Sequence, residues 1–330
     1  HDGRPAPTIV QVAGRAGVSI ATVSRVVSGT GRVREATRLR VQRAIEETGW
    51  SPDPAARALA GGRGEEVVLA VAVASQQDFG SDPHYARVIA GAQQEAARVG
   101  LFLSVHVAPL GAVASQPVFT RKRRPAGAIL VNAAPDEAAA VHGLGWPVVS
   151  MGPTARSLPS VDPDNAAGAS AAVGHLVAQG RRRIAMITGP DRNPCARERL
   201  TGYRSALRSA GLPEMGASAD FTRPGAATAA RRLLSSQPGL DAVFVASDLM
   251  ATAVVQVLQA GGRRVPDDVA VVGFDDSPPA LMTTPELSTV HHPVERLAAL
   301  AVRILADPAA GHPLDHRLPT RLVVRASSAA

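Results

Sequence analysis

The residues with the most specific chemistry near the N-terminus lie on one face of the stretch VSIATVSRVV, residues 18–27, and just after it. This face carries short side chains and one long cation: Ala21, Thr22, Ser24, Arg25 and Ser28. The guanidinium of Arg25 could donate two parallel hydrogen bonds to O6 and N7 of a guanine, and its small neighbours would let the backbone approach closely. An ordinary solvated helix surface could carry the same residues, so the elements around this face decide what it does.

The apolar residues of the same stretch recur at helical spacing: Ile20, Val23, Val26 and Val27. Six of its ten residues are β-branched and favour a strand by propensity, but the alternation of period two that marks a strand is missing. Ser19 can cap the N-terminus of a helix, and Gly29 or Gly31 can end it. The sequence therefore predicts a helix.

Two further helices are predicted around it. The first begins at Thr8, where Thr8 and Gln11 form a capping-box pattern, and Gly17 permits the left-handed turn into the second helix. The third runs from about residue 35 to 48 and stops at Gly49. The residues expected to be buried are Ile9, Val12, Ala13 and Ala16 in the first helix and Leu39, Val41, Ala44 and Ile45 in the third. Two short helices joined across a glycine turn make a helix-turn-helix.

Positive charge is concentrated in this part of the chain. The 330 residues carry a formal net charge of +7, and residues 1–64 hold ten arginines against five acidic residues. Such a surplus is expected of a segment that meets phosphates. Residues 51–64 then hold a very short helix, capped by Asp53 and stopped by Gly61, which is too short to be stable alone and should order only against a partner.

From Val67 onward, apolar runs alternate with amphipathic stretches. Strands are predicted at 67–74, 101–108, 127–131, 147–151, 183–188, 241–246 and 269–274, and helices at about 84–99, 164–179, 195–211, 226–236, 248–260 and 294–306. Near-continuous apolar runs separated by helices are typical of parallel strands that are covered on both faces. We expect a doubly wound α/β fold in two lobes, because so many strand-helix units exceed one small sheet.

Cysteine use and hydropathy indicate the compartment. The single cysteine, Cys195, can form neither an intramolecular disulfide nor a cysteine-based metal cluster, which suits a reducing environment. Residues 1–7 lack the apolar region of a signal peptide, and no apolar run approaches the roughly 20 residues that cross a bilayer. We expect a cytoplasmic protein that does not enter a membrane.

Residues 8–27 (TIVQVAGRAGVSIATVSRVV), followed by the short segment PDPAARALA, resemble the lactose/galactose repressor family of bacterial transcription regulators. Later motifs agree in order: HLVAQGRRRIAMITGP (175–190), RLTGY (199–203), VASDLMA (245–251), VPDDVAVVGFDD (265–276) and STV (288–290). The resemblance runs essentially from end to end. It implies a helix-turn-helix headpiece over 1–52, a hinge helix and linker over 53–64, and a core similar to periplasmic binding proteins over 65–330.

The resemblance also implies partners. Such proteins are homodimers or tetramers that bind a near-palindromic operator in double-stranded DNA, and a small sugar-like effector between the core lobes changes their closure. Family topology implies one lobe at 65–162 plus 292–319 and the other at 163–291 plus 320–330.

By the same resemblance, Ile20, Ala21 and Arg25 read bases in the major groove. The implied phosphate contacts, which set position without reading sequence, are Ser19, Thr22, Ser24, Ser28, Arg34, Thr37 and Trp50. In the hinge helix, Ala56 is a further implied DNA contact, and Leu59 matches a leucine that inserts into the minor groove. Asp53 departs from the family's usual asparagine and would repel DNA.

The resemblance implies six effector contacts: Tyr85, Arg199, Phe221, Ser247, Asp275 and His292. Tyr85 and Phe221 would be aromatic walls, whereas the others would hold polar groups of the ligand. Alternatives stay open for three of them: a place on a helix surface for Arg199, a brace in a turn for Asp275, as we expect of Asp276, and a hinge position for His292. Gly152 stands where the family often has an acidic ligand, so the identity of the effector does not carry over.

Two other function classes are opposed by the sequence. It lacks the G-x-G-x-x-G, P-loop and G-x-S-x-G patterns, and the adjacent Asp275 and Asp276 would point to opposite faces of a strand. We therefore expect no catalytic residue, no cofactor and no metal site. A solute-binding protein without operator control remains the alternative, but the basic headpiece argues against it.

Overall fold

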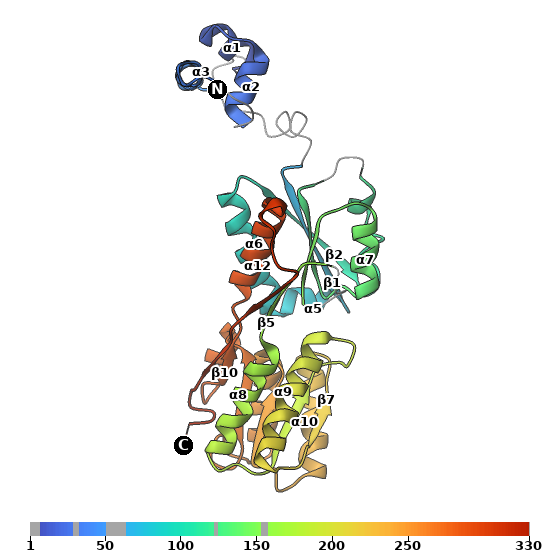
Figure 1. Cartoon of the computed structure of the whole chain (residues 1–330). Helices are drawn as coiled ribbons and strands as arrows, with labels where there is room; N and C mark the ends of the chain where they lie inside the picture. The colour runs from blue at the N-terminus through green and yellow to red at the C-terminus, as the bar shows by residue number, and fades with distance from the viewer. Residues whose placement is uncertain (1–6, 29–32, 51–63, 122–124, 153–157, 330) are drawn as a thin grey trace. The chain divides into compact units, whose positions relative to one another are not determined.

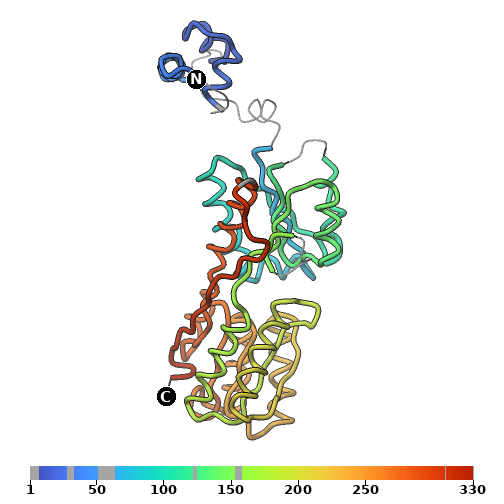
Figure 2. The backbone as a smooth tube through the Cα atoms, viewed as in Figure 1, coloured from blue at the N-terminus to red at the C-terminus, as the bar shows by residue number. Residues whose placement is uncertain are grey.

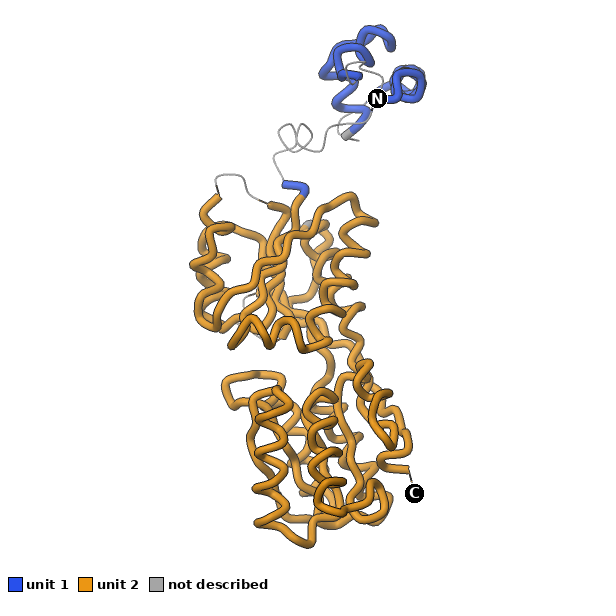
Figure 3. Tube along the Cα trace, turned by 180° about the vertical axis from the view of Figure 1, so that it is seen from behind, with its two compact units in different colours: residues 1–65 blue, residues 66–330 orange. Residues whose placement is uncertain are grey.

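The computed structural model describes residues 7–28, 33–50, 64–121, 125–152 and 158–329 (Figure 1). The chain divides into two compact units, residues 1–65 and residues 66–330, which are coloured separately in Figure 3. Each unit is described by itself below. The predicted hinge helix over 53–64, with Asp53, Ala56 and Leu59, falls almost entirely on residues 51–63, which lie outside the described residues.

The described residues of the first unit form three helices: α1 (Ile9–Ala16), α2 (Ile20–Ser28) and α3 (Glu35–Thr48). Gly17 joins α1 to α2 with φ 62°, the left-handed conformation that glycine adopts at little cost. The core of the unit consists of Val12, Ala13, Ala16, Val23, Val41 and Ala44. These observations confirm the predicted helix-turn-helix.

One expectation about the core of this unit is wrong. Leu39 is 56% exposed, because it lies about 200° around α3 from Val41, the residue that does enter the core. Ile20 is 47% exposed, which its expected contact with a base requires, although that contact stays a prediction. It is the first residue of α2, and since helical side chains lean towards the N-terminus, it projects past the end of the helix instead of onto the core.

The second unit contains two six-stranded sheets. The first sheet has the order β11-β5-β4-β3-β1-β2, and all its paired strands are parallel. Its strands are β1 (Glu66–Val73), β2 (Phe102–Pro109), β3 (Gly127–Val131), β4 (Val148–Met151), β5 (Ser160–Pro163) and β11 (Asp315–Leu318). We call the part of the unit built on this sheet lobe one.

The second sheet has the order β12-β10-β9-β8-β6-β7, in which only β12 runs antiparallel to its neighbour. Its strands are β6 (Ile184–Thr188), β7 (Gly216–Ser218), β8 (Ala242–Val245), β9 (Ala270–Asp275), β10 (Ser288–His291) and β12 (Arg321–Val323). We call the part built on it lobe two.

Helices cover both faces of the sheets. In lobe one they are α5 (Gln76–Ser81), α6 (Pro83–Arg98), α7 (Pro135–Gly143) and α12 (Val294–Ala306); in lobe two they are α8 (Asn165–Ala178), α9 (Pro194–Ala210), α10 (Arg223–Ser236) and α11 (Asp248–Ala260). Successive residues of β1 alternate between the two sides: Leu69 packs with α6 and α12, and Ala70 packs on the side of α7. This is the doubly wound α/β core that the apolar runs predicted.

The chain passes between the lobes three times (Figure 2). It crosses from β5 into α8, returns from β10 into α12, and crosses again from β11 into β12. The sheets thus take their strands from the segments that the resemblance assigned to each lobe, although the lobe boundaries stay a prediction. No helix in the described part of the chain is long and apolar enough to span a membrane.

Candidate functional site

The outer face of α2 carries the residues that the sequence singled out. Arg25 and Ala21 are exposed, and Thr22 and Ser24 are partly exposed. The Ser19 hydroxyl accepts a hydrogen bond from the backbone N–H of Thr22 at 3.2 Å, so it caps the helix as expected. A cation surrounded by small side chains is therefore presented outward, although its contact with a base stays a prediction.

The remaining predicted DNA contacts are distributed around the same unit. Arg34 is exposed and lies directly before α3, and Thr37 is partly buried in the first turn of that helix. Trp50 packs against the core of the unit, so at least part of its ring is structural. Ser28 is the last residue of α2. Arg15 and Glu47, whose Nε and Oε2 are 2.6 Å apart, tie α1 to α3.

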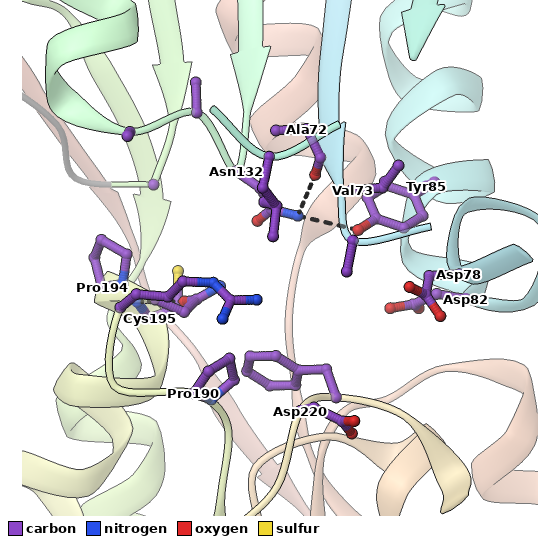
Figure 4. Close-up of a pocket in the computed structure, with 18 of the residues that line it drawn as sticks. Ala72, Val73, Asp78, Asp82, Tyr85, Asn132, Pro190, Pro194, Cys195 and Asp220 are labelled. Carbon is purple, nitrogen blue, oxygen red and sulfur yellow. Dashed lines mark hydrogen bonds between the residues drawn. The ribbon is translucent and has the colours of Figure 1, made fainter. Parts of the chain in front are cut away.

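A cavity of about 1350 Å³ lies in the second unit, where the carboxyl ends of both sheets meet (Figure 4). Lobe one contributes residues that end or follow its strands, among them Val73, Asn132 and Gly152. Lobe two contributes Pro190 and Asp220, which follow β6 and β7. Ligand sites in α/β proteins are typically formed at this edge of a sheet.

Two of the six predicted effector contacts, Tyr85 and Phe221, line this cavity. The Tyr85 hydroxyl accepts a hydrogen bond from Asn132 Nδ2 at 3.0 Å, as Figure 4 shows, and burial raises the pKa of Tyr85. Phe221 has φ 66°, and its ring lies directly over Gly189, where any larger residue would collide with it. Both aromatic side chains are thus held firmly at the cavity wall.

The other four predicted contacts, Arg199, Ser247, Asp275 and His292, lie outside the cavity lining in this conformation. Arg199 is 4% exposed, so the alternative that it lies on a helix surface is wrong. Its Nε donates to Asn165 Oδ1 at 2.9 Å, and its guanidinium stacks 3.7 Å from the ring centre of Phe274. Ser247 caps α11 by accepting a hydrogen bond from the Met250 N–H at 3.3 Å. Their role as effector contacts stays a prediction.

Asp275 lies against two of these groups, Arg199 and His292. Its Oδ1 lies 3.7 Å from Arg199 Nη1 and 3.4 Å from His292 Nδ1. Burial alone would raise the pKa of Asp275, but the hydrogen bond from His292 and the charge of Arg199 hold it below its usual range. Burial lowers the pKa of His292 to about 4, which keeps its imidazole neutral at neutral pH. Asp276 instead binds Arg325 and His291, the bracing role expected of it.

Several cavity residues were missed by sequence reasoning: Asp78, Asp82, Asn132, Arg192, Glu198 and Asp220. Asn132 follows directly after a predicted strand, and that position was the available signal. Gly152 does line the cavity, with φ 100°, so no side chain stands where an acidic ligand was looked for. Among the residues described, no group of three or more His, Cys, Asp or Glu is placed to hold a metal ion.

Comparison with known proteins places this geometry in context. The family model for bacterial regulatory proteins of the lacI family matches residues 8–53, and the model for a periplasmic binding protein-like domain matches residues 173–328. The HTH-type transcriptional regulator CelR of Thermobifida fusca is 37% identical over 344 residues, which cover 98% of this chain and 99% of that protein.

Solved structures agree over the same length. A complex of the transcriptional regulator CelR with cellobiose is 35% identical with a TM-score of 0.75 and covers 97% of this chain and 99% of its own. The lac repressor dimer bound to operator and the anti-inducer ONPF is 26% identical with a TM-score of 0.80. The match covers 99% of this chain and 100% of the repressor chain. Since such relatives extend over nearly all of the chain, we conclude that this protein belongs to the lacI family and is a DNA-binding transcriptional regulator.

Proposed function

We propose that the chain is a repressor that acts in the cytoplasm as a homodimer, binds a near-palindromic operator through α2, and changes its operator affinity when a sugar occupies the cleft. The observation that carries this proposal is the presence, in one chain, of an exposed Arg25 among small side chains and a cavity of about 1350 Å³ between two lobes. Because binding at two sites is linked, each ligand must change the affinity for the other by the same factor.

The composition of the cavity supports a sugar as the effector. Sugar rings have apolar faces and hydroxyl edges, and the cavity offers Tyr85 and Phe221 for the faces and Asn132, Asp82 and Arg192 for the edges. The related CelR has been solved with cellobiose, so this β-linked disaccharide is the first ligand to try.

A gel-shift titration of the full chain tests the proposal. An operator would be selected from a random DNA pool with the wild type, and its affinity measured with and without cellobiose for the wild type and for Arg25→Ala. Losing a bidentate arginine-guanine contact costs about 1–3 kcal/mol, so Arg25→Ala should weaken the selected operator about 5- to 150-fold and reduce discrimination at one base pair.

Arg208→Ala is the matched control, because Arg208 is exposed in the last turn of α9, in the other unit. It should bind the operator as the wild type does. If Arg25→Ala discriminates between sequences as well as the wild type, α2 does not read bases through this arginine. If no sugar changes the operator affinity of the wild type, the effector half of the proposal is wrong.

A further inference from the structure

A polar cluster lies beside the cavity where two crossing segments leave lobe one. β5 and β11 are parallel neighbours, and their register places Asp162 opposite Arg317. Each strand continues directly into lobe two, β5 into α8 and β11 into β12. Side chains at these two positions therefore lie where any change in the angle between the lobes must be accommodated.

Arg317 reaches from lobe one to lobe two. Its Nη1 and Nη2 donate to Glu198 Oε2 and Oε1 of α9 at 2.9 and 2.8 Å, a bidentate ion pair. The two side chains are 36% and 24% exposed, so solvent screens the pair only in part. The fixed fork of the guanidinium makes the contact directional, and it joins a strand of one lobe to a helix of the other.

Glu198 also lines the cavity. Besides Arg317, its Oε2 accepts a hydrogen bond from Asn165 Nδ2 at 3.0 Å. A carboxylate offers about four acceptor positions, and its partners among the described residues use three of them. One position is left for a donor in the cavity, and because Arg317 neutralises the charge, that donor need not be a cation. A neutral hydroxyl group fits this position.

Asn165 carries the same network inward. Its Nδ2 also donates to Asp162 Oδ2 at 3.1 Å, and its Oδ1 accepts from Arg199 Nε at 2.9 Å. Asn165 and Asp162 are 0% and 2% exposed, so they have little freedom to rearrange. Without Arg317, Glu198 would keep, among its described partners, only the amide of Asn165, which it shares with Asp162, and no cation from lobe one would hold its carboxylate in the cavity wall.

We propose that Arg317 is a positioning residue: it fixes Glu198 in the cavity wall as an acceptor for a ligand hydroxyl, and through the same ion pair it ties occupancy of the cavity to the angle between the lobes. This inference deepens the proposed function and rests on it, because the ligand is the effector proposed above. It assigns to two residues outside the predicted effector set both a specificity role and a coupling role.

The test compares Arg317→Gln with Arg204→Gln in the full chain. Arg204 lies on the same helix as Glu198 and forms an ion pair with Glu214 at 2.9 Å, within lobe two and away from the cavity wall. Arg204→Gln therefore removes an ion pair, as Arg317→Gln does, but it leaves the contact between the lobes intact. Arg317→Lys, which keeps the charge but not the fork, should fall between the wild type and Arg317→Gln.

The first measurement, hydrogen exchange by mass spectrometry, needs no ligand. The Asp164 N–H donates to Leu318 O at 2.9 Å and so links the two crossing segments beside Arg317. We expect faster exchange of this amide in Arg317→Gln and wild-type exchange in Arg204→Gln. Unchanged exchange in Arg317→Gln would overturn the inference, whatever the outcome with ligands.

The second measurement uses cellobiose as the probe and operator DNA as the readout. Allosteric couplings are typically 5- to 150-fold, so Arg317→Gln should reduce the effect of cellobiose on operator affinity by about fivefold or more, while Arg204→Gln keeps it. A variant that lowers only thermal stability and keeps the full effect of cellobiose would contradict the coupling role. If the wild type itself binds neither operator nor cellobiose, the proposed function fails instead, and the exchange comparison still decides whether Arg317 holds the lobes.

Discussion

Asp162 and Asp248 are acidic side chains that the second unit buries almost completely, at 2% and 0% exposure. Burial raises the pKa of each carboxyl group to about 8, and for Asp162 the neighbouring Glu198 adds to the effect. Asp248 accepts hydrogen bonds from Ser277 and Thr289, which make it part of the framework of lobe two. Asp162 has a different position, because it lies in the cluster that joins the lobes.

The raised pKa of Asp162 predicts a pH dependence of stability. Between the ordinary pKa near 4 and the folded value of about 8, the folded chain holds a proton that the unfolded chain has released, so this group lowers the free energy of unfolding as pH rises. Asp162→Asn removes the titration. We therefore expect urea denaturation to show the variant gaining stability relative to the wild type from pH 5 to pH 8.

Asp307→Asn is the control for this series, because Asp307 is exposed just after α12. Its stability difference from the wild type should not grow over the same pH range. A difference between Asp162→Asn and the wild type that stays constant from pH 5 to pH 8 would mean that Asp162 is already ionised in the folded protein.

The candidate site was only partly predictable at the level of single residues. The aromatic walls were recognised by type, and both line the cavity. Glu198 was not recognised, because nothing in its local sequence shows that Arg317, 119 positions away, would bind it. Arg199 was recognised but is enclosed by Asn165 and Phe274, and enclosure of a cation by distant partners leaves no pattern along the chain.

At the level of elements, every strand and helix named from apolar periodicity appears in the structure, with ends shifted by a few residues. The missed elements are short: β5, β7, β10, β11, β12, α5 and α7. β11 reads DHRL and is half exposed along its length, so it has no apolar run to detect. β7 has only three residues, GAS, which no periodicity can identify. Edge strands and crossing segments are defined by pairing with distant neighbours rather than by their own composition.

Helix packing depends on glycine at one position of the RLTGY motif. Gly202 of α9 faces the backbone of Ala166 in α8, and a Cβ there would collide with the carbonyl group of Ala166. The two helices therefore pack with their backbones in close approach. Gly174 on α8 is different, because it is exposed and has open space where a Cβ would be.

These two glycines predict opposite effects of the same substitution. Gly202→Ala should lower the free energy of unfolding by about 1–3 kcal/mol, the usual cost of overpacking. Gly174→Ala should raise it by roughly 0.5–1 kcal/mol, because alanine has the better helix propensity. Chemical denaturation of both variants checks the pair, and equal effects would show that the contact between α8 and α9 can relax.

At the scale of the whole molecule, the two units differ greatly in core size. In the part of the first unit that the structure describes, the core consists of six small buried residues, whereas the second unit buries large side chains such as Phe244, Phe274 and Tyr203. Small domains bury a lower fraction of their surface and are less stable. The chain should therefore unfold in more than one step.

Calorimetry of the full chain tests this expectation. We expect cellobiose to raise the transition temperature of residues 66–330, because a ligand at 100 times its dissociation constant adds about 2.7 kcal/mol to the free energy of unfolding. The transition temperature of the first unit should not change. Operator DNA should instead raise the transition temperature of the first unit, because that unit binds it. A single transition that moves as a whole with cellobiose would show that the two units unfold as one.

The threefold passage of the chain between the lobes has a mechanical consequence. Neither lobe is a continuous segment, so neither can be expressed as a simple fragment, and a protease that cuts one connection leaves the lobes held by the other two. Three parallel tethers also resist twisting far more than a single linker would. The three connections therefore favour a hinge motion in which the lobes open and close over the rotation of one lobe against the other. A small displacement in the cleft is then converted into a change in the angle between the lobes.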